Sequence, residues 1–369
     1  MSGRNPLTKS QSSALKHIAA CAEARKRDAL QTIEEILYMS DIPRSAYETA
    51  LAKLRKHARI ALHFHPDRLD SRMMTVAESL LAEGKYKSQF ETKLSNGSLT
   101  AFPGGERDRW ENDLFEGAYH SQERADGERP KYGALDLTLR PDGPASRFGS
   151  CYFLLSPKVS RRSTYTYLDS HQNPKEKGTL EELDDVMAAL LKDAFFGEYA
   201  IGEKNATPRK LIELWSARLE EPFPEPSMGA ANRNLNHYIE AQVHGEISLR
   251  EDAVALVADP SFKGTPVGGT LERIGEKYGI DLYWHMGFVL PASEVPGDFR
   301  GPAMPSLARR ISRNGLIDAS AIGAAAADLK RNPEGWKDRG TEAEALQELK
   351  LLWHVLVRYG RPFREFHRG

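Results

Sequence analysis

The stretch Asn236-His-Tyr-Ile-Glu-Ala-Gln-Val-His-Gly245 decides how the fold is interpreted, because its side chains alternate between apolar and polar. In an extended strand, residues two apart share a face. One face would be apolar, and the other would carry a phenol, a carboxylate, an amide and an imidazole. Exposed strand faces usually carry lysine, threonine and serine, so this composition favours a functional face over an ordinary solvated one. The apolar residues are Ile239, Ala241 and Val243, and the polar ones are Tyr238, Glu240, Gln242 and His244.

The polar face of this segment suits one kind of chemistry. A carboxylate in a sheet cleft can stabilise the positive charge that develops on a sugar carbon during glycosyl cleavage. An amide one strand-step away can orient a hydroxyl group. Glu240 and Gln242 are therefore the first catalytic candidates, and the reaction they suit is cleavage at an anomeric carbon.

Further strands and helices are expected on both sides of this segment. Alternating leucines predict a strand over residues 131–139, and an apolar run predicts a buried strand over residues 148–155. Strand-forming residues fill positions 163–167. Helical spacing covers residues 179–196 and 208–219, and it dominates the chain before Glu83 and after Met304. Within the first helical region, Pro66 would end a helix near Phe64 or His65.

These elements predict an α+β fold with a helical N-terminal region (residues 1–83), a mixed or antiparallel sheet domain (84–303) and a helical C-terminal region (304–369). Lys+Arg number 51 and Asp+Glu 52, and this balance disfavours a nucleic-acid partner. The N-terminus lacks an apolar signal segment, no apolar run reaches membrane-spanning length, and two cysteines cannot form a disulfide framework. We expect a cytoplasmic protein without a membrane partner.

The segment Ala61-Leu-His-Phe-His-Pro-Asp-Arg-Leu69 permits three interpretations. His63 and His65, with a carboxylate nearby, could serve a metal-dependent hydrolase. Alternatively, Pro66 ends a helix and Asp67 caps the next one. The third interpretation is a resemblance, since residues 37–68 resemble the first half of a chaperone J domain, in which a basic helix leads into a His-Pro-Asp loop. That resemblance implies that His65, Pro66 and Asp67 contact a heat-shock chaperone.

A wider resemblance covers residues from about 60 to 245. Several phrases resemble a family of uncharacterised bacterial proteins known only as a domain of unknown function, and this family name implies no reaction. The phrases are His63-Phe-His-Pro-Asp-Arg, Tyr86-Lys-Ser-Gln-Phe-Glu-Thr, Ala101-Phe-Pro-Gly-Gly, Arg129-Pro-Lys-Tyr-Gly-Ala-Leu, Arg147-Phe-Gly-Ser-Cys-Tyr-Phe and Ile239-Glu-Ala-Gln-Val-His-Gly.

A subset of these phrases is similar to the ADP-ribosyltransferase-like domains of bacterial toxins. That resemblance implies two small sheets around a cleft for NAD. It also implies a basic residue or histidine on an early strand, a Ser- or Tyr-bearing middle strand, and a late strand with a glutamate. Here the late strand would carry Glu240 and the middle strand Ser150. The early residue would be Arg59, His63, Arg68 or Arg129, and the nicotinamide-stacking residue Tyr132, Tyr165 or Tyr238.

The leading expectation is an NAD-using ADP-ribosyltransferase-like enzyme that acts on an unknown protein or small-molecule acceptor. The catalytic residues would be Glu240, Gln242 and Ser150. The J-domain-like contact and the metal-dependent hydrolase are the alternatives, and no metal ligand is assigned. The chain has no Gly-x-Ser-x-Gly elbow, dinucleotide-binding glycine motif or P-loop. The cofactor-binding residues would be His63, His65, Arg129, Tyr132, Tyr165 and His244.

Overall fold

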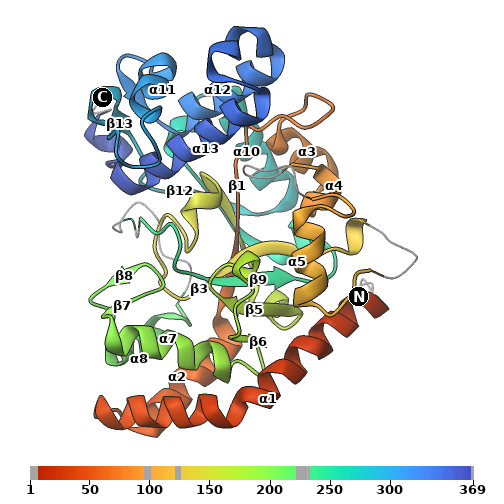
Figure 1. Cartoon of the computed structure of the whole chain (residues 1–369), viewed down its shortest axis with the longest axis vertical. Helices are drawn as coiled ribbons and strands as arrows, with labels where there is room; N and C mark the ends of the chain where they lie inside the picture. Colours follow the sequence, from red (N-terminus) through yellow and green to blue (C-terminus); the bar gives the residue numbers. More distant parts are fainter. Residues whose placement is uncertain (1–6, 95–100, 121–125, 222–230, 232, 367–369) are drawn as a thin grey trace.

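The computed structural model describes residues 7–94, 101–120, 126–221, 231 and 233–366. This part of the chain has the expected α+β architecture, with a large sheet between N-terminal and C-terminal helices (Figure 1). The helices at the two ends of the chain lie on opposite sides of the sheet in this view. The sheet therefore forms the middle of the molecule and supplies strands to both halves.

Eight strands form the main sheet, and their neighbours are antiparallel except for the pair β11–β12. This pair is joined by helix α10 (Pro266–Tyr278), which returns the chain to the same end of the sheet, as a parallel pair requires. The described strands thus form one continuous main sheet, whereas the toxin resemblance implied two small sheets. In spatial order they are β12 (Asp281–Trp284), β11 (Ala253–Ala258), β4 (Cys151–Leu155), β1 (Arg59–Phe64), β3 (Lys131–Asp136), β9 (Ile239–Val243), β5 (Ser163–Tyr167) and β6 (Lys177–Thr179).

Helices cover the sheet on several sides. The long helix α1 packs against α7 and β6, and α2 packs against α8. The C-terminal helices α11, α12 and α13 pack against one another at the other end of the molecule (Figure 1). The bounds are α1 (Lys9–Met39), α2 (Arg44–His57), α3 (Val76–Glu83), α4 (Gln89–Thr92), α5 (Glu106–Leu114), α6 (Pro157–Ser160), α7 (Asp184–Phe196), α8 (Pro208–Arg218), α9 (Leu249–Asp252), α11 (Met304–Ile311), α12 (Ala319–Arg331) and α13 (Glu342–Tyr359).

Short two-stranded ribbons complete the strand set among the described residues. They pair β2 (Lys85–Tyr86) with β10 (Ile247–Ser248), β7 (Tyr199–Ala200) with β8 (Glu203–Lys204), and β13 (Leu290–Pro291) with β14 (Leu316–Ile317). The first ribbon joins the segment after α3 to the segment after β9, so these two parts of the chain lie side by side.

The predicted helix that runs up to Pro66 is wrong over its last residues. Helix α2 ends at His57, and Ala58 already has extended geometry. Residues 59–64 form the strand β1, which pairs with β3 on one side and β4 on the other. Their alternation fits a sheet, because Ile60, Leu62 and Phe64 enter the main core while Ala61 joins a smaller cluster on the other face. Long-range pairing therefore overrode a local helical preference.

Strand β1 links the expected N-terminal region to the sheet. Residues of the expected N-terminal helical region provide a central strand of the sheet. The boundaries at residues 83 and 303 stay a prediction. Helix α7 begins at Asp184 and not near Thr179, because residues 177–179 pair with β5 as the edge strand β6.

The alternation predicted for the segment around Glu240 is confirmed. Strand β9 lies between β3 and β5, and its three apolar residues enter the main core. The polar face is not solvated, because Glu240 is only 5% exposed and Gln242 and His244 are fully buried. Helix α5 and the residues after it cover this face, where Tyr119 stacks on His244 with ring centroids 6.1 Å apart.

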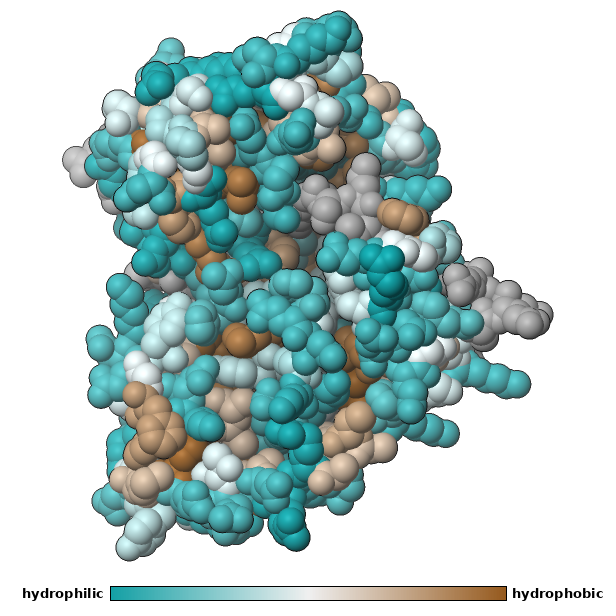
Figure 2. Space-filling view, in the orientation of Figure 1, coloured by the Kyte–Doolittle hydropathy of each residue, from teal (hydrophilic) through white to brown (hydrophobic). Residues whose placement is uncertain are grey.

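The outer surface is mostly hydrophilic on the face shown in Figure 2, with hydrophobic residues in separate patches. Among the described residues, none of the helices combines the length and apolar character needed to span a bilayer.

Candidate functional site

A cleft of about 620 Å³ opens along the polar face of the sheet. Its volume lies in the range of small-molecule and cofactor sites. Strands β1, β3 and β9 form its floor, helix α5 and residues 68–94 form walls, and helices α12 and α13 close one end. Of the residues expected from the sequence, the cleft brings together Glu240, His63, His65 and Tyr132, as well as Tyr238 and Arg68 from the wider candidate sets.

Glu240 is the buried carboxyl group of the cleft. Its Oε1 accepts a hydrogen bond of 2.9 Å from the Gln242 amide, and Ser170 also interacts with its side chain. Burial, together with the neighbouring negative charge of Asp169, raises the pKa of Glu240 to about 8. Strongly shifted carboxyl groups in clefts are frequent at functional sites, because the desolvation that shifts them also strengthens their interaction with a bound charge.

Gln242 does not line the cleft but holds Glu240 from beneath. Its Oε1 accepts a 2.8 Å hydrogen bond from Thr164, and its Nε2 lies 3.2 Å from the Thr166 hydroxyl. Because the carbonyl end is bound to Thr164, the NH₂ end must point toward Glu240. Strand pairing between β5 and β9 places both threonines on the same face. Gln242 is therefore placed to position Glu240, whereas the sequence suggested that it orients substrate.

An arginine clamped between two aromatic rings forms the wall next to Glu240. The guanidinium carbon of Arg107 lies 4.5 Å from the ring centroids of both Trp110 and Tyr132. The Tyr132 hydroxyl donates a 2.8 Å hydrogen bond to Glu111 Oε1, which fixes the ring. Cation–π contacts of this kind hold a guanidinium rigidly while leaving its N–H groups free to donate.

Asp169 organises the other side of Glu240. Its carboxylate accepts a 2.8 Å hydrogen bond from Tyr238, and it forms ion pairs with Arg147 at 3.1 Å and His171 at 2.8 Å. Burial favours the neutral form of Asp169, but hydrogen bonds from His171 and Tyr238 and the charge of Arg147 outweigh it and lower the pKa. Asp169 is therefore the ionised member of the carboxyl pair, and its charge helps to keep Glu240 protonated at neutral pH.

His63 on β1 and His65 just after it line the cleft as neutral rings. His63 stacks against Tyr152 with ring centroids 4.9 Å apart, and burial lowers its pKa to about 3. His65 meets Trp353 edge to face at 5.2 Å, and burial lowers its pKa well below the usual value. Each ring can exchange hydrogen bonds with a neutral group of a ligand. A neutral imidazole does not attract an anion by charge.

The His-Pro-Asp segment is enclosed by the fold. His65 and Asp67 are each 8% exposed and Pro66 is buried, and the segment follows a strand instead of a helix. The described surface thus has no exposed His-Pro-Asp loop of the kind that a chaperone contact would use. Among the described residues, no group of three or more His, Cys, Asp or Glu side chains is arranged to hold a metal ion.

Besides Gln242, four expected site residues lie outside the cleft. Arg129 is buried in ion pairs with Asp108 and with Glu111, the latter at 2.8 Å, and Tyr165 lies in the main core on the opposite face of the sheet. His244 is bound to Tyr119 and to Thr164 at 3.1 Å, and burial lowers its pKa to about 3. Ser150 is buried next to β4, and its hydroxyl has no partner among the described residues. None of these four side chains lines the cleft.

Sequence reasoning missed several residues that line the cleft. Arg107 and Trp110 are three residues apart on α5, and this spacing places them on one helix face. This spacing can be read from the sequence, but it does not indicate a binding site, because the sequence does not show that Tyr132 packs on Arg107. Asp169 and His171 were visible only as an isolated Asp-Ser-His phrase, and Lys350 had no local signal, because it reaches the cleft from α13.

Comparison with known proteins adds one finding. A family model described as "Protein of unknown function (DUF3626)" matches residues 59–359, which is well over half of the chain. The match begins at β1 and ends at the last residue of α13, so it contains every cleft element named above. Among curated proteins, no significant match is found.

Proposed function

The chain belongs to the family described as Protein of unknown function (DUF3626), and we propose that it is an ADP-ribosyltransferase-like enzyme that cleaves NAD at the anomeric carbon of the nicotinamide ribose. The observation that carries this proposal is the joint placement of Glu240, Tyr132, Tyr238 and His63 in one cleft. Strands β1, β3 and β9 are adjacent in the sheet and bring a histidine, a tyrosine and a glutamate into the same cleft, whereas Ser150, expected on the middle strand, does not line it.

The role of Glu240 follows from its position on the cleft floor. NAD supplies a ribose carbon that becomes positively charged as nicotinamide departs. An ionised carboxylate in a buried site stabilises such charge more strongly than one in water. Gln242 keeps the Glu240 carboxyl oriented through its 2.9 Å hydrogen bond. The chain's own contribution is therefore an oriented carboxylate held away from solvent.

Aromatic residues of the cleft suit the flat rings of a dinucleotide. Tyr238 and Phe148 meet edge to face at 5.5 Å and, with Ala134 and Ala145, form a small apolar cluster on the cleft side of the sheet. Tyr132 and Trp110 also line the cleft, each with Arg107 over its ring. Stacking on such rings binds a planar heterocycle without requiring a charged partner. These surfaces support a dinucleotide ligand and leave the acceptor open.

Glu240→Gln tests this proposal directly. The substitution preserves size and removes the charge, so we expect release of nicotinamide from NAD by the purified protein to fall about 100-fold, the usual cost of losing one electrostatic group in a buried site. The control is Glu213→Gln, because Glu213 is exposed on α8. The proposal fails if both variants cleave NAD as fast as the unmodified protein, or if the unmodified protein releases no nicotinamide in the presence of candidate acceptors.

A further inference from the structure

Three cationic side chains meet at the Glu240 end of the cleft, from segments far apart in the chain. Arg107 comes from α5, Arg147 from the turn before β4, and Lys350 from α13. Arg300 adds a fourth positive charge close to Lys350 and Arg147. Such a gathering of positive charge is costly in a half-buried site unless anions offset it.

The described residues offset this charge in part, through Asp169 beside Arg147 and Glu111 near Arg107. Arg147 is paired with Asp169, but the carboxyl of Glu240 is kept largely protonated at neutral pH. The Nε and Nη1 atoms of Arg107 are buried and have no hydrogen-bond partner among the described residues. Lys350 forms no ion pair with the described carboxylates. Burial lowers the pKa of Lys350, and repulsion from Arg147, Arg300 and Arg107 lowers it further, against the opposing effect of Asp169.

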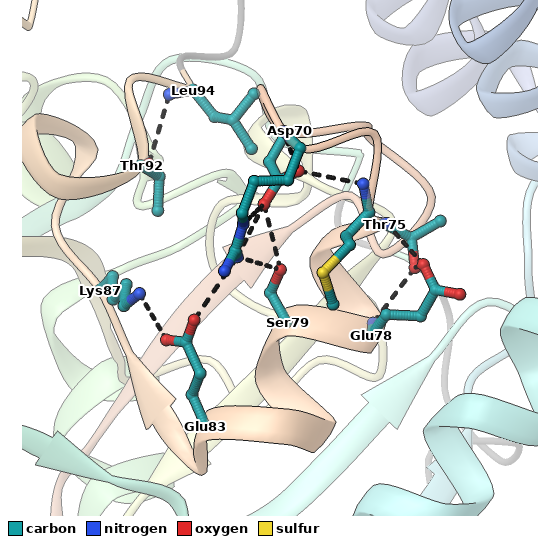
Figure 3. A network of polar contacts seen from close by, with 10 residues as sticks. Asp70, Thr75, Glu78, Ser79, Glu83, Lys87, Thr92 and Leu94 are labelled. Atoms are coloured by element: carbon teal, nitrogen blue, oxygen red, sulfur yellow. Dashed lines mark hydrogen bonds and ion pairs between the residues drawn. The ribbon is translucent and has the colours of Figure 1, made fainter.

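On the opposite wall of the cleft, several cations are already paired with carboxylates. Asp70, Ser79, Glu83 and Lys87 lie in one polar network there (Figure 3). Arg72 bonds to Asp70 at 2.8 Å and reaches Glu83 at 3.4 Å. At the α12–α13 end, Lys330 pairs with Glu342 at 3.3 Å. Each of these cations already has a carboxylate partner, whereas Arg107 and Lys350 have no ion pair with a described carboxylate.

The geometry of Arg107 and Arg147 is also prepared for a ligand. Arg107 is clamped by two rings, and Arg147 lies 4.5 Å above Phe148 while donating a 2.9 Å hydrogen bond to the Leu235 carbonyl. Both guanidinium groups are thus held in place before anything binds. Planar guanidinium groups bind phosphate oxygens in pairs of hydrogen bonds, and an ammonium adds a point charge.

We propose that Arg107, Arg147 and Lys350 form a subsite for a phosphate-bearing group beside Glu240, and that helix α13 thereby completes the site. The chemical class is an organic phosphate or diphosphate. Its location next to the reacting carboxylate rests on the proposed function, but the binding itself does not. The phosphate has two possible sources, the diphosphate of NAD or a phosphorylated acceptor, and the experiment separates them.

The first test measures the equilibrium binding of ADP, pyrophosphate and adenosine to the full chain by titration calorimetry. We expect ADP and pyrophosphate to bind, adenosine to bind at least about 10-fold more weakly than ADP, and added salt to weaken ADP binding. Lys350→Met and Arg107→Met should each weaken ADP binding about 10-fold, as expected for loss of one charge-assisted hydrogen bond.

Matched variants keep the test specific. Lys192→Met, at an exposed position on α7, should leave ADP binding unchanged, and Lys350→Arg should retain most of it because the charge remains. Thermal unfolding of each variant shows whether the fold is intact. The subsite is refuted if ADP binds no better than adenosine, or if Lys350→Met and Lys192→Met, both folded, bind ADP equally well.

Failure of the subsite can be told apart from failure of the proposed reaction. Glu240→Gln should still bind ADP, because Glu240 is not one of the three cations. If ADP binds through Lys350 and NAD is not cleaved, the subsite stands and the reaction is overturned. If NAD is cleaved, a higher KM for NAD in Lys350→Met assigns the phosphate to the donor. An unchanged KM with lost ADP binding assigns it to the acceptor.

Discussion

Glu240 illustrates how burial decides a residue's chemistry. The same glutamate on an exposed strand would be ionised at neutral pH, but here burial raises its pKa to about 8, and Asp169 contributes to the shift. A carboxylate that stabilises positive charge must be ionised. An acid is half ionised when the pH equals its pKa, and its ionised fraction approaches one above that pH. Glu240 is therefore mostly protonated at pH 6 and mostly ionised at pH 9, and only the ionised form suits the proposed role.

The ionisation of Glu240 predicts how the reaction rate depends on pH. The rate of nicotinamide release should rise about tenfold per pH unit below pH 8 and level off above it, as for a single essential ionised group. The measurement is a rate profile between pH 6 and 9.5 at saturating NAD. The residual rate of Glu240→Gln should lack this rise. A flat profile for the unmodified protein over the same range would contradict the role given to Glu240.

The packing of helix α12 depends on Gly323, which has no side chain. A Cβ at Gly323 would lie 1.4 Å from the nearest oxygen of the Asp67 carboxylate, so the helix packs directly on the segment after β1. Asp67 is buried, and its carboxyl oxygens have no hydrogen-bond partner among the described residues. Burial raises the pKa of Asp67 to about 6. The contact leaves the carboxyl group little room to move.

Gly323→Ala should therefore destabilise the protein even though alanine favours helices. We expect a loss of about 1–3 kcal/mol, the usual cost of overpacking a filled site, measured by denaturant unfolding. Gly269→Ala is the control, because Gly269 lies in α10 and an added Cβ would meet no atom within 4 Å. That variant should be neutral or more stable by up to about 1 kcal/mol. Equal stability of the two variants would contradict the close contact of α12 with Asp67.

At the scale of the whole molecule, the C-terminal helices are joined to the sheet through Trp353. Its ring contacts His65 at 5.2 Å and Phe288 at 5.8 Å, and its indole N–H donates a 3.0 Å hydrogen bond to the Ser146 carbonyl. The tryptophan is fully buried. It therefore connects α13 with the end of β1 and with the turn that carries Arg147, both of which border the cleft.

Trp353→Ala should destabilise the protein, because it removes the contacts that join α13 to the residues bordering the cleft. We expect a loss of about 3–5 kcal/mol in the free energy of unfolding, as for other large buried aromatic residues. The control is Phe196→Ala, since Phe196 is 71% exposed at the end of α7 and should change stability by less than about 0.5 kcal/mol. Chemical denaturation of both variants provides the comparison. A Trp353→Ala protein as stable as Phe196→Ala would show that α13 does not depend on this contact.

The net charge of −1 has a specific meaning once the structure is known. Near-neutrality argued against a broad nucleic-acid surface, but it concealed a local excess of cations next to Glu240. Arg107, Arg147 and Lys350 are separated by 40 residues or more in the chain, and only folding brings them together. The net charge of the sequence does not show how its charges are distributed in space.

The sequence by itself determined strand β9, the direction of each of its side chains and the place of Glu240 on its polar face. These follow from alternation with a period of two, which is a property of neighbouring residues. Only the tertiary structure decided that residues 59–64 form a strand, because their helical preference yields to pairing with β3 and β4. It also decided the partners of Glu240. Asp169 and Arg107 reach it through long-range packing, and no local pattern encodes which distant side chains will share a buried cleft.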